Sequence, residues 1–172
     1  MPIVPDVKNW TWVLERRCDE CSFDASLIRY DEIPELLRKN ANAWPAVLGR
    51  SDVRLRPNES TWSALEYAAH VRDVFRLFPQ RLALILANDG PTFANWDQDE
   101  TAESERYNEQ DPAIVGEQLI DAGEAAALAF GAVAPEDRTR AGYRSDGAVF
   151  TVEALARYFV HDPIHHLHDV SG

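Results

Sequence analysis

The chain has 172 residues, of which 45% are hydrophobic and 27% are charged, as expected for a globular domain with one buried core. Acidic residues outnumber basic ones by 29 to 17, for a formal net charge of -12, and no Lys/Arg cluster exists to track nucleic-acid phosphates. No apolar run approaches the roughly 18 to 20 residues that cross a bilayer, and the N-terminus lacks a signal-peptide layout. We therefore expect a cytoplasmic protein with neither a membrane nor a nucleic-acid partner.

Residues 1–30 are mixed in character and predict an arm laid over the rest of the chain, packed through Trp10, Trp12 and Leu14. From Asp31 to Gly49 the apolar residues recur at helical spacing, which predicts the first main helix. Pro45 should kink or divide this helix, because proline removes a backbone donor.

The longest helix is expected over 62–87, after a cap at Ser60 or Thr61, with a bend at Pro79. Residues 91–111 are polar and acidic and predict a long crossover that contains at most a short helix. A third helix is expected over 112–132, starting at a favourable first-turn proline, and a fourth follows a cap at Thr151. Four helices with little strand signal predict one all-α domain over 1–172: an arm over 1–30 and a four-helix bundle over 31–172.

Four of the five histidines lie within eight residues near the C-terminus. His161 and His165 are four apart, so on a helix they share one face about 6 Å apart along the axis and can converge on one ion. His166 is rotated away from His161 and should face elsewhere, whereas a His165/His168 pair remains a competing choice. His70, in the longest helix, is the remaining histidine, and bundle metal sites use side chains from facing helices.

This pattern predicts a divalent metal bound by His70, His161 and His165, with His168 as the alternative ligand. Three protein ligands are typical of catalytic zinc, because structural zinc sites fill all four positions with protein donors. The competing interpretations are that His70 is an ordinary helix residue and that the C-terminal histidines are helix-end cations.

Two stretches of the chain resemble the DinB-like family of metal-dependent four-helix bundles, and in particular its mycothiol-dependent maleylpyruvate isomerase branch. They are Trp62-Ser-Ala-Leu-Glu-Tyr-Ala-Ala-His70 and Tyr158-Phe-Val-His161-Asp-Pro-Ile-His165-His166, supported by Asn95-Trp-Asp-Gln-Asp99 and Asp146-Gly-Ala-Val-Phe-Thr151. The resemblance runs from about residue 30 to the end of the chain. Pro163 between the expected ligands and His168, where many relatives have glutamine, depart from the family pattern.

The resemblance implies zinc or nickel on His70, His161 and His165, with water in the remaining positions. It also implies a thiol-dependent transferase or isomerase that uses a low-molecular-weight thiol such as mycothiol and acts on a small electrophile. In such a site the metal lowers the pKa of the thiol. Homodimers also occur in the family.

Several other residues are candidates for the site. Asp73, Glu66 and Asp169 are rivals to orient a ligand imidazole, and Asp73 or Glu66 is the candidate base; otherwise each is a solvated helix charge. Substrate contacts are assigned to Trp96 and Asp97, which otherwise only hold the crossover, and to Arg144, a candidate anion contact.

Cys18 and Cys21 form a C-x-x-C pair, which could be a redox pair or half of a zinc site. No second C-x-x-C exists to complete such a zinc site, so we interpret them as packing residues.

Three functions remain open from the sequence. The first is the thiol-dependent enzyme. The second is a non-catalytic metal-binding stress-response or binding protein. The third is a hydrolase in which the metal activates water.

Overall fold

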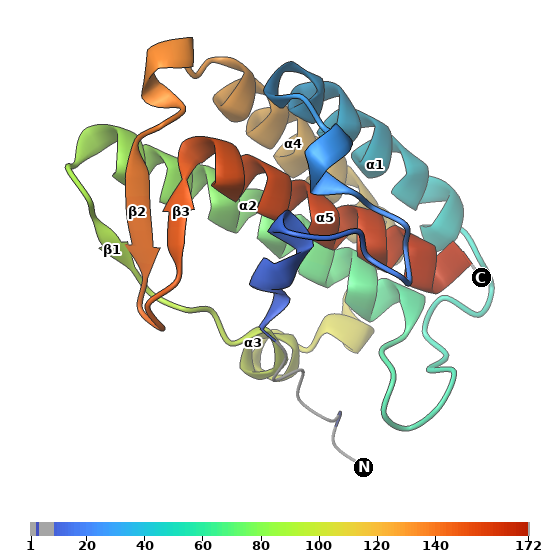
Figure 1. Ribbon diagram of the computed structural model, residues 1–172. Helices are drawn as coiled ribbons and strands as arrows, with labels where there is room; N and C mark the ends of the chain where they lie inside the picture. The colour runs from blue at the N-terminus through green and yellow to red at the C-terminus, as the bar shows by residue number, and fades with distance from the viewer. Residues whose placement is uncertain (1–2, 4–8, 172) are drawn as a thin grey trace.

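The computed structural model describes residue 3 and residues 9–171, and four long helices dominate it (Figure 1). They are α1 (Ile33–Leu48), α2 (Ala64–Ala87), α4 (Pro112–Gly131) and α5 (Val152–Ser171). Helices α1 and α2 each pack against both α4 and α5, so α1 and α2 occupy opposite corners of the bundle. The predicted four-helix bundle is confirmed. No helix among the described residues is long and apolar enough to cross a membrane.

The helix starts follow local hydrogen-bonding chemistry. The N-cap of α2 is Ser63, whose hydroxyl accepts from the Glu66 N–H while the Glu66 carboxylate accepts from the Ser63 N–H, a reciprocal capping box. The expected cap at Ser60 or Thr61 was therefore wrong by two or three residues. Helix α5 starts as predicted, because the Thr151 hydroxyl accepts from the Ala154 N–H at 3.1 Å.

Helix α5 continues through Pro163, which lies between His161 and His165. The amide of Asn40, buried on α1, donates to the Pro163 carbonyl at 2.7 Å and accepts from the Trp44 indole N–H at 3.0 Å. This contact ties α1 to α5 beside the histidines. Pro163 therefore does not end the helix.

A small sheet makes the all-α prediction wrong in part. It contains β1 (Thr92–Phe93), β2 (Ala141–Arg144) and β3 (Val149–Thr151) in that order, with β1 parallel to β2 and β2 antiparallel to β3. Strands of two to four residues are too short to show a period-2 pattern in the sequence. Gly147 lies in the turn between β2 and β3 and has a positive φ of 93°.

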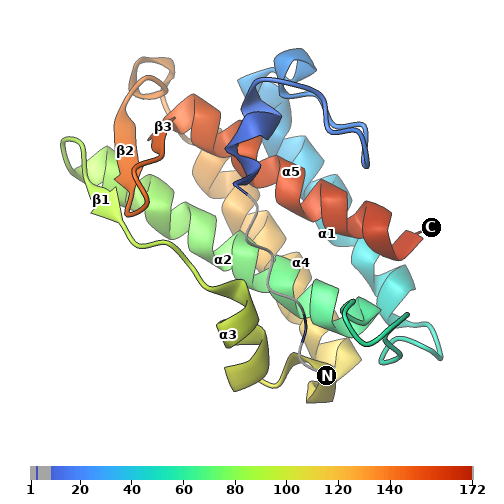
Figure 2. The same cartoon turned by 60° about the horizontal axis from the view of Figure 1, so that its bottom comes forward.

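The crossover over 91–111 is more structured than predicted: β1, the short helix α3 (Gln98–Ser104) and a 3₁₀ turn, η4 (Tyr107–Glu109), lie in it. The N-terminal arm contains three further 3₁₀ turns, η1 (Trp10–Leu14), η2 (Ala25–Leu27) and η3 (Tyr30–Glu32). All three contact α5, and the arm crosses that helix in both ribbon views (Figures 1 and 2). The part of the predicted arm at 1–2 and 4–8 lies outside the described residues.

Candidate metal centre

The donor side chains of α5 alternate between two faces of the helix. Consecutive residues are rotated by 100° around a helix axis, so His161 and His165 point one way while Asp162 and His166 point another. Both pairs have the four-residue spacing that lets two side chains meet one ion. Among the described residues, each pair belongs to a separate group of potential metal donors whose atoms lie within 4.8 Å of one another.

The first group joins α5 to α2 and contains His70, Asp162 and His166. His70 Nε2 lies 3.3 Å from Asp162 Oδ1, and His166 Nε2 lies 3.8 Å from the same oxygen. Two donors each about 2.1 Å from one zinc ion at the tetrahedral angle lie about 3.4 Å apart. The spacing is therefore that of donors around a shared ion.

His70 is completely buried, and both of its ring nitrogens lack a hydrogen-bond partner among the described residues, as does Asp162 Oδ1. The His70 ring stacks on Trp96 at 5.3 Å between centroids and packs against Trp62 at the same distance. Unpaired polar atoms at such depth are costly. A metal ion between them would satisfy both the imidazole and the carboxylate, so the residues fit one.

A carboxylate orients the third donor. Asp169 Oδ2 lies 3.0 Å from His166 Nδ1, which leaves His166 Nε2 directed toward Asp162. Burial acts to raise the pKa of Asp162, but the neighbouring imidazoles of His70 and His166 outweigh it and the pKa is lowered. Asp162 is therefore charged at neutral pH, and Asp169, one of three candidates to orient a ligand imidazole, contacts the imidazole of His166.

The second group joins α5 to the N-terminal arm and contains Cys18, Cys21, His161 and His165. Both cysteines are free thiols, and Cys18 Sγ lies 3.6 Å from His165 Nδ1. Burial raises the pKa of the Cys21 thiol to about 11. Burial, followed by the charge of His165, lowers the pKa of His161 to about 4, so this imidazole is neutral at pH 7.

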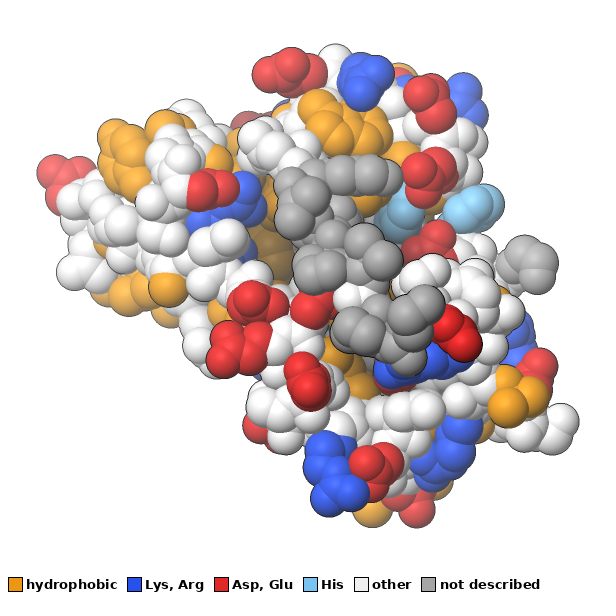
Figure 3. Space-filling model, turned by 90° about the horizontal axis from the view of Figure 1, so that it is seen from below, with side chains coloured by type: hydrophobic (Ala, Val, Ile, Leu, Met, Phe, Trp, Pro, Cys, Tyr) orange, Lys and Arg blue, Asp and Glu red, His pale blue; other side chains and the backbone are white. Residues whose placement is uncertain are grey.

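A cavity of about 290 Å³ opens beside both groups. Its lining includes donors of both groups and other polar and aromatic side chains: Trp10, Glu20, Tyr67, Gln98, Tyr158, His161, Asp162, His165, His166 and Asp169. Glu20, His165 and Asp169 form a third, largely exposed donor group at its edge. The face in Figure 3 shows histidine side chains among acidic ones.

The three histidines predicted to share an ion are divided between two groups. His70 joins Asp162 and His166, whereas His161 and His165 join the cysteines. The alternative, His168, is exposed and lines a separate hollow between α1 and α5. The sequence reasoning identified the four-residue spacing of His161 and His165, and Asp162, which has that spacing to His166, was a signal for a second pair that it did not use.

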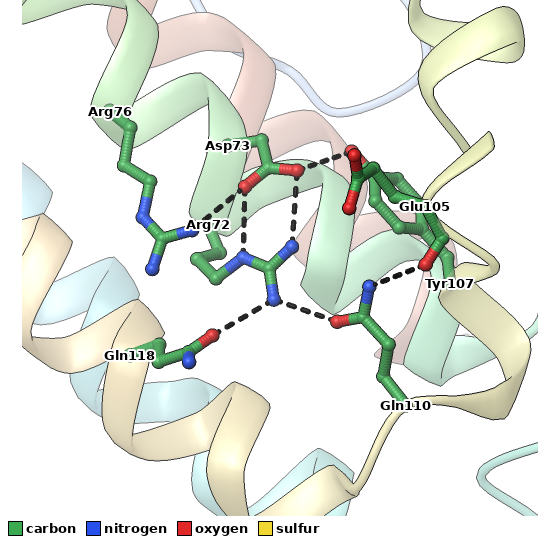
Figure 4. Close-up of polar contacts among 7 residues, drawn as sticks. All are labelled: Arg72, Asp73, Arg76, Glu105, Tyr107, Gln110 and Gln118. Carbon is green, nitrogen blue, oxygen red and sulfur yellow. Dashed lines mark hydrogen bonds and ion pairs between the residues drawn. The ribbon is translucent and has the colours of Figure 1, made fainter.

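Asp73, a predicted orienting residue or base, lies in a polar network between α2, η4 and α4 (Figure 4). Its carboxylate pairs with Arg72 at 2.9 and 3.1 Å, with Arg76 at 3.3 Å, and accepts from the Tyr107 hydroxyl at 2.5 Å. These contacts hold the crossover against the bundle, and the carboxylate faces arginines and a tyrosine instead of an imidazole.

Glu66 and Asp97 cap helices. Besides capping α2, Glu66 forms an ion pair with Arg56, with Nε 3.0 Å from Oε2. Asp97 accepts from the Glu100 N–H at the start of α3, and together with Glu66 it lines a different hollow. Each of these carboxylates therefore has a structural partner away from the donor groups.

The other predicted substrate contacts lie closer. Trp96 stacks on His70. Arg144 is buried in a bidentate pair with Asp146 and donates to the Tyr158 hydroxyl at 3.1 Å; Tyr158 lines the cavity. Arg144 therefore supports a cavity residue and does not itself form the lining.

Comparison with solved structures finds the same fold. YfiT from Bacillus subtilis, described as a probable metal-dependent hydrolase with an unusual four-helix bundle topology, matches with a TM-score of 0.65 and 18% identity over 99% of this chain and 92% of its own. No curated protein sequence matches the chain. The model of the DinB superfamily matches residues 35–170, which include α1, α2, α4, α5 and all the donors outside the arm. The chain therefore belongs to the DinB superfamily.

Proposed function

We propose that this protein is a metal-dependent enzyme that holds one catalytic divalent ion, zinc or nickel, with His70, Asp162 and His166. The observation that carries the proposal is the convergence of three donors: His70 Nε2 and His166 Nε2 lie 3.3 and 3.8 Å from Asp162 Oδ1, and the buried His70 and Asp162 atoms meet outside hydrogen-bond geometry. A metal ion between them would give each of these atoms a partner. Three protein donors are also the number typical of a catalytic zinc site.

The chain's own residues prepare this centre. Trp62 and Trp96 fix the His70 ring and exclude water from it. Asp169 fixes the tautomer and orientation of His166. A divalent ion bound here would supply the acidity that converts a bound thiol or water into a nucleophile at neutral pH.

The charges around the cavity favour a thiol cofactor that carries no negative charge of its own. Among the described residues its lining contains three carboxylates, from Glu20, Asp162 and Asp169, and neither Lys nor Arg. An anionic thiol would be repelled there, whereas an uncharged sugar thiol of the mycothiol type could donate and accept hydrogen bonds with Tyr67, Gln98 and Tyr158. We therefore propose a thiol-dependent transferase or isomerase that acts on a small electrophile.

A metal-assisted hydrolase is the second candidate. YfiT, which has the same fold, is described as a probable metal-dependent hydrolase. Glu20 and Asp169 line the same cavity, and a carboxylate there could accept a proton from an attacking water.

Turnover assays on metal-loaded protein separate these candidates. An activated aryl halide would be offered with and without mycothiol, and a nitrophenyl ester without thiol, to the wild type and to Asp162→Asn. Thiol-dependent turnover that is lost in the variant supports the first proposal. Ester cleavage without thiol, lost in the same variant, supports the hydrolase. A metal-loaded protein inactive in both assays would be a metal-binding protein without catalysis.

A further inference from the structure

The four donors on the arm-facing side of α5 have the composition and spacing of a closed zinc site. The cysteines are spaced C-x-x-C and the histidines H-x-x-x-H, which are spacings found in Cys₂His₂ sites. The structure brings the two halves together although Cys18 and His165 are 147 residues apart in the sequence. All four donor atoms lie within 4.8 Å of one another.

The distance between Cys18 Sγ and His165 Nδ1 fits tetrahedral coordination. Bonds of about 2.3 Å to sulfur and about 2.05 Å to nitrogen, opened to the tetrahedral angle, place the two donors about 3.6 Å apart. The distance from Cys18 Sγ to His165 Nδ1 is 3.6 Å.

Three of the four donors are buried, and Cys21 is partly buried. Cys18 is fully buried, and His161 and His165 are 4% and 6% exposed. His161 Nε2 has no hydrogen-bond partner among the described residues. Aromatic rings cover the histidines: Trp10 lies 5.7 Å from His161 and 5.2 Å from His165 between centroids, and Phe23 lies 5.4 Å from His161.

The backbone around the cysteines is a tight turn. The Cys18 N–H donates to the Phe23 carbonyl at 2.8 Å, and the Ser22 N–H donates to the Cys18 carbonyl at 2.9 Å. Ser22 adopts a left-handed conformation with φ 65°, which is costly for a residue with a Cβ. The turn presents both sulfurs to α5. A metal ion bound by both segments would offset the free-energy cost of the Ser22 conformation.

We propose that Cys18, Cys21, His161 and His165 bind a second, structural zinc ion, separate from the ion on His70, Asp162 and His166. Four protein donors close its coordination sphere. This ion fixes the N-terminal arm to α5 and so fixes Trp10, which forms part of the wall of the catalytic cavity. The proposal stands on its own donors and does not require the catalytic site.

Metal content by elemental analysis tests it, on protein expressed in zinc-supplemented medium and freed of any affinity tag. We expect about two zinc ions per wild-type chain. We expect one in the Cys18→Ser/Cys21→Ser double variant and one in His70→Ala. His168→Ala is the matched control, because it removes an exposed histidine of the same helix, and it should retain two.

The outcomes separate the two sites. A cysteine variant that retains every ion bound by the wild type overturns the structural site, whatever His70→Ala does. Loss of one ion in the cysteine variant with no loss in His70→Ala supports the structural site and contradicts the catalytic one.

A second measurement needs no variant that could fail to fold. Wild-type protein is titrated with a thiol-specific mercurial while a chromogenic chelator reports free zinc. We expect one zinc released per chain in step with modification of two thiols. Two thiols that react without zinc release, or a Cys18–Cys21 disulfide in protein purified without reductant, would overturn the proposal.

Discussion

The two faces of α5 carry the same four-residue spacing but different chemistry. The face toward α2 presents Asp162 and His166 to a single histidine, beside an open cavity. The face toward the arm presents His161 and His165 to two cysteines, under Trp10 and Phe23. Both histidine pairs line the cavity, so the donor sets make the difference. Three hard or intermediate donors leave a coordination position open for a reactive ion, whereas four donors that include two sulfurs close the sphere of a structural one.

A shift of one position along the helix therefore decides which donor group a histidine joins. His165 and His166 are neighbours in sequence, yet their ring planes meet at 85° and they belong to different donor groups. The experiments below alter one face at a time.

The largest effect is expected on the α2 face. His70→Ala removes the donor that α2 contributes to the group with Asp162 and His166, so the ion is lost together with the several kcal/mol of transition-state stabilisation that it supplies. Turnover should fall more than about a thousand-fold, measured as kcat/KM on metal-loaded protein. His168→Ala should stay within about two-fold of wild type by the same kinetic criterion, and an equal loss there would contradict the assignment.

The arm face should matter chiefly for stability. Removing an ion present at about a thousand times its dissociation constant lowers stability by about 4 kcal/mol, or on the order of 10 °C in Tm for a chain of this size. We expect that loss in Cys18→Ser/Cys21→Ser, by thermal unfolding in the presence of zinc. A Tm within about 2 °C of wild type would show that no structural ion had been removed.

A smaller effect is expected from the contact between Asp169 and His166 beside the cavity. Asp169→Asn keeps the shape of the side chain but weakens the contact with His166 Nδ1, so metal affinity and turnover should each fall about 10- to 100-fold. Competition with a metal-binding dye measures the affinity. Unchanged affinity, with Asp97→Asn as the control, would mean that Asp169 is a surface charge.

The smallest effect is expected at Glu66. Burial acts to raise the pKa of its carboxyl, but Arg56 and Ser63 outweigh burial and lower it. A folded-state pKa below the unfolded one contributes stability at neutral pH that is lost on acidification. Glu66→Gln should therefore cost about 1 kcal/mol at pH 7, and the difference should shrink below about pH 4.

Denaturant unfolding of the wild type and of Glu66→Gln, at pH 7 and below about pH 4, measures this difference in stability. Turnover should remain within about three-fold of wild type at pH 7, since a general base would contribute at least about a hundred-fold. A loss of that size would restore Glu66 as the base.

The four helices could be predicted because long amphipathic periods and caps such as Thr151 are local signals. The sheet could not, because its strands have two to four residues and Gly142 is fixed by a tertiary contact: a Cβ there would lie 2.7 Å from Ile85. Asp73 shows the same limit. Its three-residue spacing from His70 suggested a partner, but Arg72 and Tyr107 face its carboxylate in the folded chain.

The donor residues of the two sites could be predicted in part, but their grouping could not. The sequence reveals which residues can donate to a metal and which pairs share a helix face, but it does not reveal the rotation of α5 against its neighbours. That rotation turns Asp162 toward His70 and turns His161 toward the arm. The C-x-x-C pair was set aside because no second such pair exists, and its partners on α5 had already been assigned elsewhere.

Anomalous diffraction at the zinc edge, from crystals of untagged protein grown with zinc, tests the central claim most directly. We predict two peaks, one bounded by His70, Asp162 and His166 and the other by Cys18, Cys21, His161 and His165. A single peak bounded by His70, His161 and His165 would contradict the account and restore the three-histidine site.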